Sequence, residues 1–451
     1  MNKDDMRHRV QQQSGQDVIV FLDQVKLRKR RRNVYRSWLL VSILVSCAIL
    51  VGLLYYQIDH RLPSIINVRA GKVEVLDLGI PAKAQVVSVS KQGVSNVPAG
   101  SIDIDLSRPV TLKAADADNY GLQVKLFGFL NFKEIDLRVI EDQELIPVGM
   151  PVGIYVKTKG VMVIGTGEFQ TAHGDKVSPS KGLLKSGDYI LYMNGVAVSD
   201  KDDFMKMIRF GAGKPLTMTV IRDGKELKQT IQPQKDTKGE YKIGLWVRDS
   251  AQGIGTMTYM DGEGNFGALG HGIADVDTSD LMTMDDGTLY MAEVVDIKKG
   301  AVGKPGEMTG LIVYSNDRIL GDINNNCERG IFGRCNKKAG GKFRENPVPI
   351  GLKQEITSGP AQIICTVDGV PKYYDIEIND INLNHSNVNR GIELTVVDEE
   401  LLAITGGIVQ GMSGSPILQN GKIVGAVTHV LVNDPTRGYG IFIENMLEAA
   451  E

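Results

Sequence analysis

The stretch that decides the fold is GMSGSP, residues 411–416, which predicts a tight turn that presents one serine hydroxyl. Its glycines allow close backbone approach and dihedral angles that a residue with a Cβ avoids. The pair Asn420-Gly421 follows, between the apolar residues 417–418 and the apolar run 423–427, and such a pair indicates a β-hairpin. We therefore expect a glycine-flanked serine at the mouth of a hairpin. The alternative is a polar, glycine-rich turn without chemistry.

A serine nucleophile needs a histidine base. Histidines occur at positions 8, 60, 173, 271, 385 and 429. His271 lies in GALGHGI, residues 267–273, a short apolar strand end with glycines on both sides of the imidazole. These small neighbours leave room for a substrate backbone and for the serine. His429 follows the predicted strand 423–428 and is expected to line the same site. A histidine packed only for structure is the alternative.

Several motifs in the same order resemble the stage IV sporulation protein B peptidases of endospore-forming bacteria. They are GALGHGIADVDT (267–278), KGAVGKPGEMTG (299–310), GIFG (330–333), GGIVQGMSGSP (406–416) and VGAVTHVLVND (424–434). The resemblance implies a triad in which Ser413 attacks, His271 carries the proton and Asp398 fixes the imidazole tautomer. The backbone N–H groups of Gly411 and Ser413 are predicted to form the oxyanion hole.

The aspartate of the triad rests on the resemblance alone. Asp398 ends a predicted strand fifteen residues before Ser413. Two carboxylates follow it directly and two more lie near the histidine, so the identity of the orienting carboxylate stays open. These four are Glu399, Glu400, Asp275 and Asp277.

The resemblance also implies a biological role. Such peptidases are made in the forespore, exported to the space between its two membranes, and cut themselves. They also cleave a membrane-bound regulator of an intramembrane protease, which leads to activation of a late sigma factor. Two other functions stay open. One is an envelope quality-control serine protease, and the other is a non-catalytic PDZ adaptor with a protease-like fold.

Composition and motif content exclude several other classes of function. The chain has 451 residues, which suggests several domains, and a net charge of −3 argues against nucleic-acid binding by the whole chain. No Cys/His cluster with metal-ligand spacing and no phosphate-binding or dinucleotide fingerprint occurs, so neither a metal nor a cofactor is expected. Cys365 is expected to be buried, and a disulfide between Cys327 and Cys335 stays open.

The N-terminal region predicts a single membrane anchor. Residues 1–36 form a tail with seven Lys and Arg residues between positions 26 and 36, and residues 37–57 are almost wholly apolar. Such a segment is long enough to span the hydrocarbon core, and the basic flank places the N-terminus in the cytoplasm. Because no small-residue cleavage site follows, we expect an uncleaved anchor rather than a removed signal peptide. The remaining domains are then extracytoplasmic.

The rest of the chain predicts a mainly β protein. Residues 58–136 alternate as a small β-domain, a spacer in its simplest interpretation. Residues 137–236 resemble a PDZ domain, with a helix over 202–210 and a closing hairpin around Asp223-Gly224. Residues 237–451 show short β-type runs, which predicts a chymotrypsin-like peptidase domain of two barrels.

The PDZ resemblance implies a peptide partner, bound as an added strand. The predicted open edge strand is Gly153, Ile154, Tyr155 and Val156. A module that only packs on the peptidase is the alternative. The expected partners are thus a protein substrate, a peptide or C-terminus on the PDZ module, and the membrane.

Overall fold

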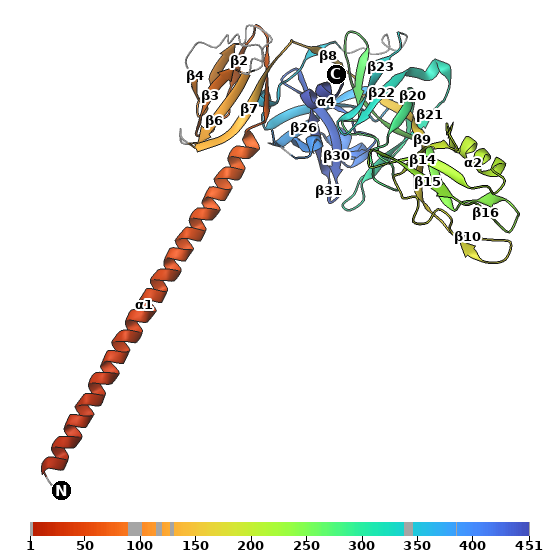
Figure 1. Cartoon of the computed structure of the whole chain (residues 1–451). Coiled ribbons are helices and arrows are strands. Elements are labelled where there is room, and N and C mark those ends of the chain that lie inside the picture. The colour runs from red at the N-terminus through yellow and green to blue at the C-terminus, as the bar shows by residue number, and fades with distance from the viewer. Residues whose placement is uncertain are drawn as a thin grey trace. The chain divides into compact units, whose positions relative to one another are not determined.

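The computed structural model describes residues 3–88, 102–113, 120–126, 130–337, 346–384 and 386–450. It is mainly β, as the sequence predicts, and it divides into two units, residues 1–62 and 63–451. The first unit is one helix, α1 (Lys3–Arg61), drawn in red in Figure 1. Within the described residues, its part Lys29–Arg61 is the one helix long and apolar enough to cross a membrane. The predicted span 37–57 lies inside it.

A small β-domain begins the second unit. Its sheet has the order β1-β7-β6-β3-β4, with β1 parallel to β7, and a separate pair β2-β5 completes it. The strands are β1 (Ile65–Arg69), β2 (Val73–Leu76), β3 (Ala82–Ser88), β4 (Ile102–Asp105), β5 (Val110–Lys113), β6 (Tyr120–Leu126) and β7 (Leu130–Ile140). Alternating burial along β6 and β7 gives this domain its own apolar core.

A buried polar cluster ties this domain to the C-terminal part of the chain. Arg69 on β1 pairs with Glu74 at 2.7 Å and with Glu355 at 3.0 Å. The Asn67 side chain donates to the buried carboxylate of Glu444. Removing one partner of such a buried pair leaves an uncompensated charge, which is strongly destabilising. The small β-domain is therefore more than a spacer.

Two long strands are each shared by an inserted module and a barrel. β9 (Pro151–Thr166) and β18 (Leu245–Met260) pair along almost their whole length. Residues 161–166 of β9 and 245–248 of β18 join a module inserted between them, whereas residues 151–158 and 250–260 belong to a barrel. Gly160 lies where β9 passes from the barrel into the inserted module. Its φ is +71°, and a Cβ there would lie 2.3 Å from the Ile190 carbonyl oxygen, so glycine is required at this close approach. The predicted domain boundaries at residues 136 and 236 are corrected accordingly.

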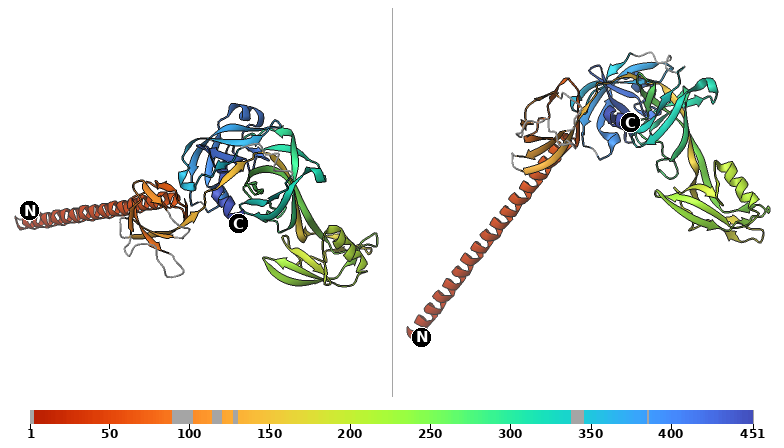
Figure 2. Two further views of the ribbon diagram at one scale, coloured as in Figure 1. Left: turned by 90° about the horizontal axis from the view of Figure 1, so that it is seen from above. Right: turned by 45° about the horizontal axis from the view of Figure 1, so that its top comes forward.

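The inserted module, residues 161–247, has a sheet of order β15-β14-β12-β9 with α2 packed on it (Figure 2). The helix begins after Asp200, whose side chain caps it, and buries Phe204 and Ile208. The hairpin at Asp223-Gly224 is present, with both residues at positive φ as its type I′ turn requires. The elements are β10 (Phe169–Gln170), β11 (Lys176–Val177), β12 (Tyr189–Met193), β13 (Val196–Ala197), α2 (Lys201–Phe210), β14 (Leu216–Arg222), β15 (Lys225–Ile231), β16 (Gln234–Lys235) and β17 (Tyr241–Lys242).

The first barrel closes as the ring β9-β18-β19-β23-β22-β20, because β20 pairs back onto β9. Its further strands are β19 (Asn265–Ala268), β20 (Met284–Lys298), β22 (Ile319–Cys327) and β23 (Gly330–Cys335), with β8 (Glu144–Pro147), β21 (Gly306–Ile312) and β24 (Val348–Pro349) attached. Cys327 and Cys335 lie at opposite ends of the β22–β23 hairpin, and both are free thiols in the structure.

The second barrel is closed in the order β25-β26-β27-β31-β30-β29 and is drawn in blue in Figure 1. Cys365 is fully buried in its core, as expected. The barrel strands are β25 (Gly359–Thr366), β26 (Pro371–Ile381), β27 (Ile392–Val396), β29 (Pro416–Gln419), β30 (Lys422–Leu431) and β31 (Asp434–Phe442). The elements before, between and after them are η3 (Lys353–Glu355), η4 (Val388–Arg390), α3 (Glu399–Thr405), β28 (Val409–Gln410), which pairs with β21, and α4 (Ile443–Ala450). A further short helix, η1 (Asn316–Arg318), lies between β21 and β22 of the first barrel.

Candidate active site

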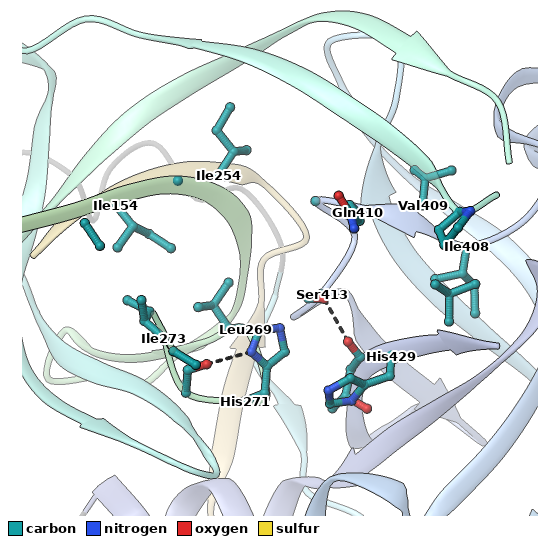
Figure 3. A pocket seen from close by; sticks show the side chains of 18 of the residues that line it. Ile154, Ile254, Leu269, His271, Ile273, Ile408, Val409, Gln410, Ser413 and His429 are labelled. Atoms are coloured by element: carbon teal, nitrogen blue, oxygen red, sulfur yellow. Dashed lines mark hydrogen bonds between the residues drawn. The ribbon is translucent and has the colours of Figure 1, made fainter. Parts of the chain in front are cut away.

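His271 and Ser413 line one cavity of about 490 Å³, although they belong to different barrels (Figure 3). His271 follows β19 of the first barrel, and Ser413 lies between β28 and β29 at the mouth of the second. His429 on β30 lines the same cavity, as the sequence predicts. The cavity thus brings a serine and two imidazoles together.

Two glycines shape the turn that carries the serine. Gly411 has φ +103° and Gly414 has φ +98°, both in the region that favours glycine. A Cβ on Gly414 would lie 2.0 Å from the Thr256 carbonyl oxygen, so no other residue fits there. The predicted hairpin follows, with Asn420 and Gly421 at positive φ between β29 and β30. The turn therefore reaches the first barrel because its glycines let the two backbones meet.

The Ser413 hydroxyl does not hydrogen-bond to His271 in this structure. Its Oγ donates to the carbonyl oxygen of Thr428 at 2.8 Å, which Figure 3 marks with a dashed line. The serine and histidine share a cavity, but the bond that activates a serine nucleophile is not formed.

The imidazole of His271 is held by its own backbone. Its Nδ1 lies 2.9 Å from the carbonyl oxygen of Gly272. Because a carbonyl only accepts, Nδ1 carries the proton and the lone pair is left on Nε2, the atom that a general base uses. Burial lowers the pKa of His271 below its usual value. The ring is therefore the neutral Nδ1–H tautomer near pH 7.

His429 forms a second imidazole beside the first. The two ring centroids are 5.3 Å apart. Burial, with a smaller contribution from the charge of His271, lowers the pKa of His429 to about 4. Its Nδ1 atom is buried and has no hydrogen-bond partner among the described residues. His429 is thus neutral and shapes the cavity wall next to Thr428.

The amides of the nucleophile turn divide into engaged and free groups. Met412 N–H donates to Val409 at 3.1 Å, and Gly414 N–H donates to Val427 at 2.7 Å. In the part of the chain that the structure describes, the N–H groups of Gly411 and Ser413 donate to no protein acceptor. These are the two groups that the sequence predicts for an oxyanion hole.

Thr256 on β18 is a residue that the sequence did not reveal. Its N–H donates to the Ser413 carbonyl at 2.9 Å, and its hydroxyl donates to the Gly411 carbonyl at 2.8 Å. Its own carbonyl accepts from Leu269 N–H at 3.1 Å, two residues before His271. Thr256 thus links the nucleophile turn to the histidine loop. No local pattern marks it, because the link forms only when the two barrels meet.

Asp398 has a different position from the one that the resemblance implies. Its carboxylate caps α3, accepting from Leu401 N–H at 2.9 Å and from Asp375 N–H at 3.3 Å. It does not line the cavity, and the Nδ1 atom of His271 is occupied by Gly272. The predicted triad is therefore not assembled here. A short Asp beside a helix start satisfies free N–H groups, which is why this residue follows the strand.

Two of the other acidic candidates, Asp275 and Asp277, share one cationic partner. Arg248 binds Asp275 and Asp277 with its two terminal nitrogens, the second at 2.7 Å. These carboxylates therefore fix the loop after His271. Asn326 completes the loop by bonding both the N–H and the carbonyl of Ile273.

The predicted open edge strand at residues 153–156 is wrong. Gly153, Ile154, Tyr155 and Val156 pair with β18 on one side and with β20 on the other. They form a central strand of the first barrel, and Ile154 lines the catalytic cavity. The PDZ-like pattern predicts that this strand belongs wholly to the inserted module, whereas β9 continues into the first barrel.

Residues 239–447 match the family described as SpoIVB peptidase S55. These residues form a serine peptidase domain of the SpoIVB family. The match includes His271, Ser413 and the whole second barrel. Near the N-terminus of the same chain, one apolar helix provides a membrane anchor.

Two solved structures of the Rv3671c protease resemble part of this peptidase. The inactive form is 10% identical, with a TM-score of 0.26, and covers 44% of this chain and 82% of its own. The active form, from M. tuberculosis, is 13% identical, with a TM-score of 0.24, and covers 44% and 73%. The family assignment rests on the sequence match of residues 239–447.

Proposed function

We propose that this SpoIVB-family peptidase is an extracytoplasmic endopeptidase of sporulation signalling. It cleaves itself and a membrane-bound regulator of an intramembrane protease, and so triggers activation of a late sigma factor. The N-terminal helix holds it in the membrane with the basic residues 26–36 in the cytoplasm. The observation that carries this function is that His271 and Ser413, from two barrels, share one cavity.

Activation begins with a rotation of the Ser413 side chain. The hydroxyl leaves the Thr428 carbonyl and turns to the Nε2 atom of His271. A serine has three staggered rotamers, so the hydroxyl can leave the Thr428 carbonyl by rotation about χ1. The freed Thr428 carbonyl is then available to accept an N–H from the substrate.

The chemistry is that of acyl transfer. Ser413 Oγ attacks the scissile carbonyl carbon while its proton passes to His271 Nε2. The negative charge on the carbonyl oxygen is stabilised by the free N–H groups of Gly411 and Ser413. His271 then gives the proton to the leaving amine, and water releases the acyl group by the same route in reverse. The Gly272 carbonyl keeps the histidine in the required tautomer.

Self-cleavage in a spore-forming host tests this function. The full chain is expressed as wild type, Ser413→Ala, His271→Ala and Ser415→Ala, and its fragments are followed by immunoblot. Ser415 is the matched control, because it lies two residues on and is fully buried. We expect processing in the wild type and in Ser415→Ala only. Normal processing of Ser413→Ala would assign the chain to the non-catalytic adaptor class.

We further propose that the inserted module is a PDZ-type domain that binds an extended peptide, at a different place from the one predicted. A groove of about 450 Å³ lies between α2 and residues 241–247. Residues 245–247 pair with β9 on one side, and the exposed Trp246 and Met205 line the groove. A peptide can add to the strand on its other side.

Binding of a peptide library to the full chain tests the groove. Met205→Gln should weaken binding, because this side chain lines the groove. Lys206→Gln is the control, since Lys206 is the next residue on α2 and does not line it. Equal binding by both variants and the wild type would leave the module as a packing element.

A further inference from the structure

A second groove of about 470 Å³ continues from the catalytic cavity. Both are lined by residues of β18 and of the nucleophile turn. The shared residues are Gln252, Gly253, Ile254, Gln410 and Gly411. A polypeptide bound at Ser413 therefore has a continuous path into this second groove.

One wall of the groove is a strand with a free edge. β21 pairs with β20 from Glu307 to Ile312, and with β28 only at Gly306 and Glu307. Residues 308–312 therefore have a strand on one side only, within the described part of the chain. Such an edge carries unpaired N–H and C=O groups that pair with an added strand. At about 3.3 Å per residue, it accommodates roughly five residues of extended chain.

The opposite end of the groove is an ordered aromatic surface. Tyr314 is 50% exposed, and its hydroxyl donates to Gln252 Oε1 at 2.7 Å. Its ring meets Tyr290 and Tyr155 edge to face, with centroids 5.1 and 5.9 Å away. An exposed aromatic that is already fixed offers apolar contact at a low cost in conformational entropy.

The lining of both cavities is almost free of charge. Among the described residues, no Asp, Glu, Lys or Arg lines the catalytic cavity, and Glu307 is the one such residue in the second groove. A charged substrate side chain would lose its hydration here without gaining a partner. The chemistry of the walls thus selects uncharged, apolar segments.

The position of the groove fixes which part of the substrate enters it. Figure 3 shows Ile254 and Gln410 on one side of Ser413 and His429 on the other. The Thr428 carbonyl beside His429 is the acceptor available to the residue before the cut. The residues that follow the cut therefore leave on the side of Gln410, where the second groove begins.

We propose that this groove binds about five residues after the cut as an extended strand paired to the free edge of β21. The substrate class is an extended, uncharged, apolar polypeptide segment, with Tyr314 contacting its side chains. The proposal rests on the peptidase function proposed above, and it adds the strand and the tyrosine that select the substrate.

N-methylated peptides test the pairing directly. A library of internally quenched decapeptides is screened for cleavage by the wild type that Ser413→Ala lacks. The cleaved peptide is then N-methylated at each of the five positions after the cut. Because alternate amides of a strand face the same partner, we expect kcat/KM to fall about fivefold or more at alternate positions and little at those between.

Two tyrosine variants test whether the exposed aromatic surface at Tyr314 contacts the substrate. Tyr314→Ala should lower kcat/KM about tenfold for peptides with apolar residues after the cut, and should not affect a peptide truncated there. Tyr192→Ala is the control, because Tyr192 is similarly exposed but lies on β12 of the inserted module. Cleavage that is indifferent to N-methylation and to Tyr314→Ala would overturn the groove while leaving the peptidase function intact. Absence of any Ser413-dependent cleavage would instead contradict the peptidase function, and the groove with it.

Discussion

The Ser413 hydroxyl donates its hydrogen bond to the Thr428 carbonyl oxygen, 2.8 Å away, while the imidazole of His271 stands in the same cavity without that bond. In the proposed mechanism, the serine hydroxyl occupies the carbonyl oxygen that later accepts an N–H of the substrate. We therefore expect substrate binding and serine activation to be coupled, because the substrate N–H needs the Thr428 carbonyl that the serine hydroxyl must leave.

The link made by Thr256 should matter for both stability and cleavage. Thr256→Val keeps the side-chain shape but removes the hydrogen bond to the Gly411 carbonyl. We expect a loss of about 1 kcal/mol in the free energy of unfolding, with reduced peptide cleavage because the nucleophile turn loosens. Chemical denaturation and a peptide assay measure the two effects.

Thr258→Val is the matched control for this variant. Thr258 lies two residues further along β18, is fully buried, and its hydroxyl has no partner among the described residues. Its replacement should be neutral or stabilising. Equal effects of the two substitutions would show that the Thr256 bond has no special role.

Two substitutions of Asp398 separate a role in capping α3 from a role in catalysis. Asp398→Ser keeps an N-cap but removes the charge, and Asp398→Ala removes both. We expect Asp398→Ser to cleave peptides within about threefold of the wild type, and Asp398→Ala to lose about 1 kcal/mol of stability. If Asp398→Ser has wild-type stability but no activity, the aspartate belongs to the triad as the family resemblance implies.

Acid should destabilise the peptidase through its buried imidazoles. The pKa of His429 is about 4 in the folded chain, whereas an unfolded histidine titrates near 6.5. Between these values the unfolded chain binds more protons, so stability falls as pH drops from about 6.5 to 4. Charges on His271 and Arg390 also oppose protonation of His429, so they lower its pKa further.

His429→Gln should therefore flatten the decline of Tm between pH 7 and pH 4.5, measured by thermal denaturation. His173→Gln, at an exposed position in the inserted module, is the control. A pH profile of His429→Gln that matches the wild type would show that His429 does not control acid stability.

The sequence predicted those parts of the fold and site that local patterns control. The turn at 411–416, the Asn420-Gly421 hairpin and the helix of α2 follow from glycine dihedral angles, turn chemistry and helix capping. His271 could be chosen among the histidines because glycines on both sides allow close approach of another backbone.

The rest depended on contacts between segments far apart in the chain. The polar residues 157–160 interrupt the apolar pattern of β9, but such an interruption is also expected at a turn or a bulge, so the pattern does not show that one strand continues from the barrel into the inserted module. The role of Thr256 depends on backbone partners about 155 residues away, at Gly411 and Ser413. The position of Asp398 at the start of α3 could not be predicted, because the residue types that orient a histidine also cap helices.

Covalent labelling with a fluorophosphonate tests the central claim most directly, namely that Ser413 is a nucleophile activated by His271. The intact chain is treated with the probe and digested, and the modified peptide is located by mass spectrometry. We predict one adduct on Ser413, which is lost in His271→Ala and retained in Ser415→Ala, where the replaced serine is buried. An adduct on Ser415, or labelling of Ser413 that is unchanged in His271→Ala, would contradict it.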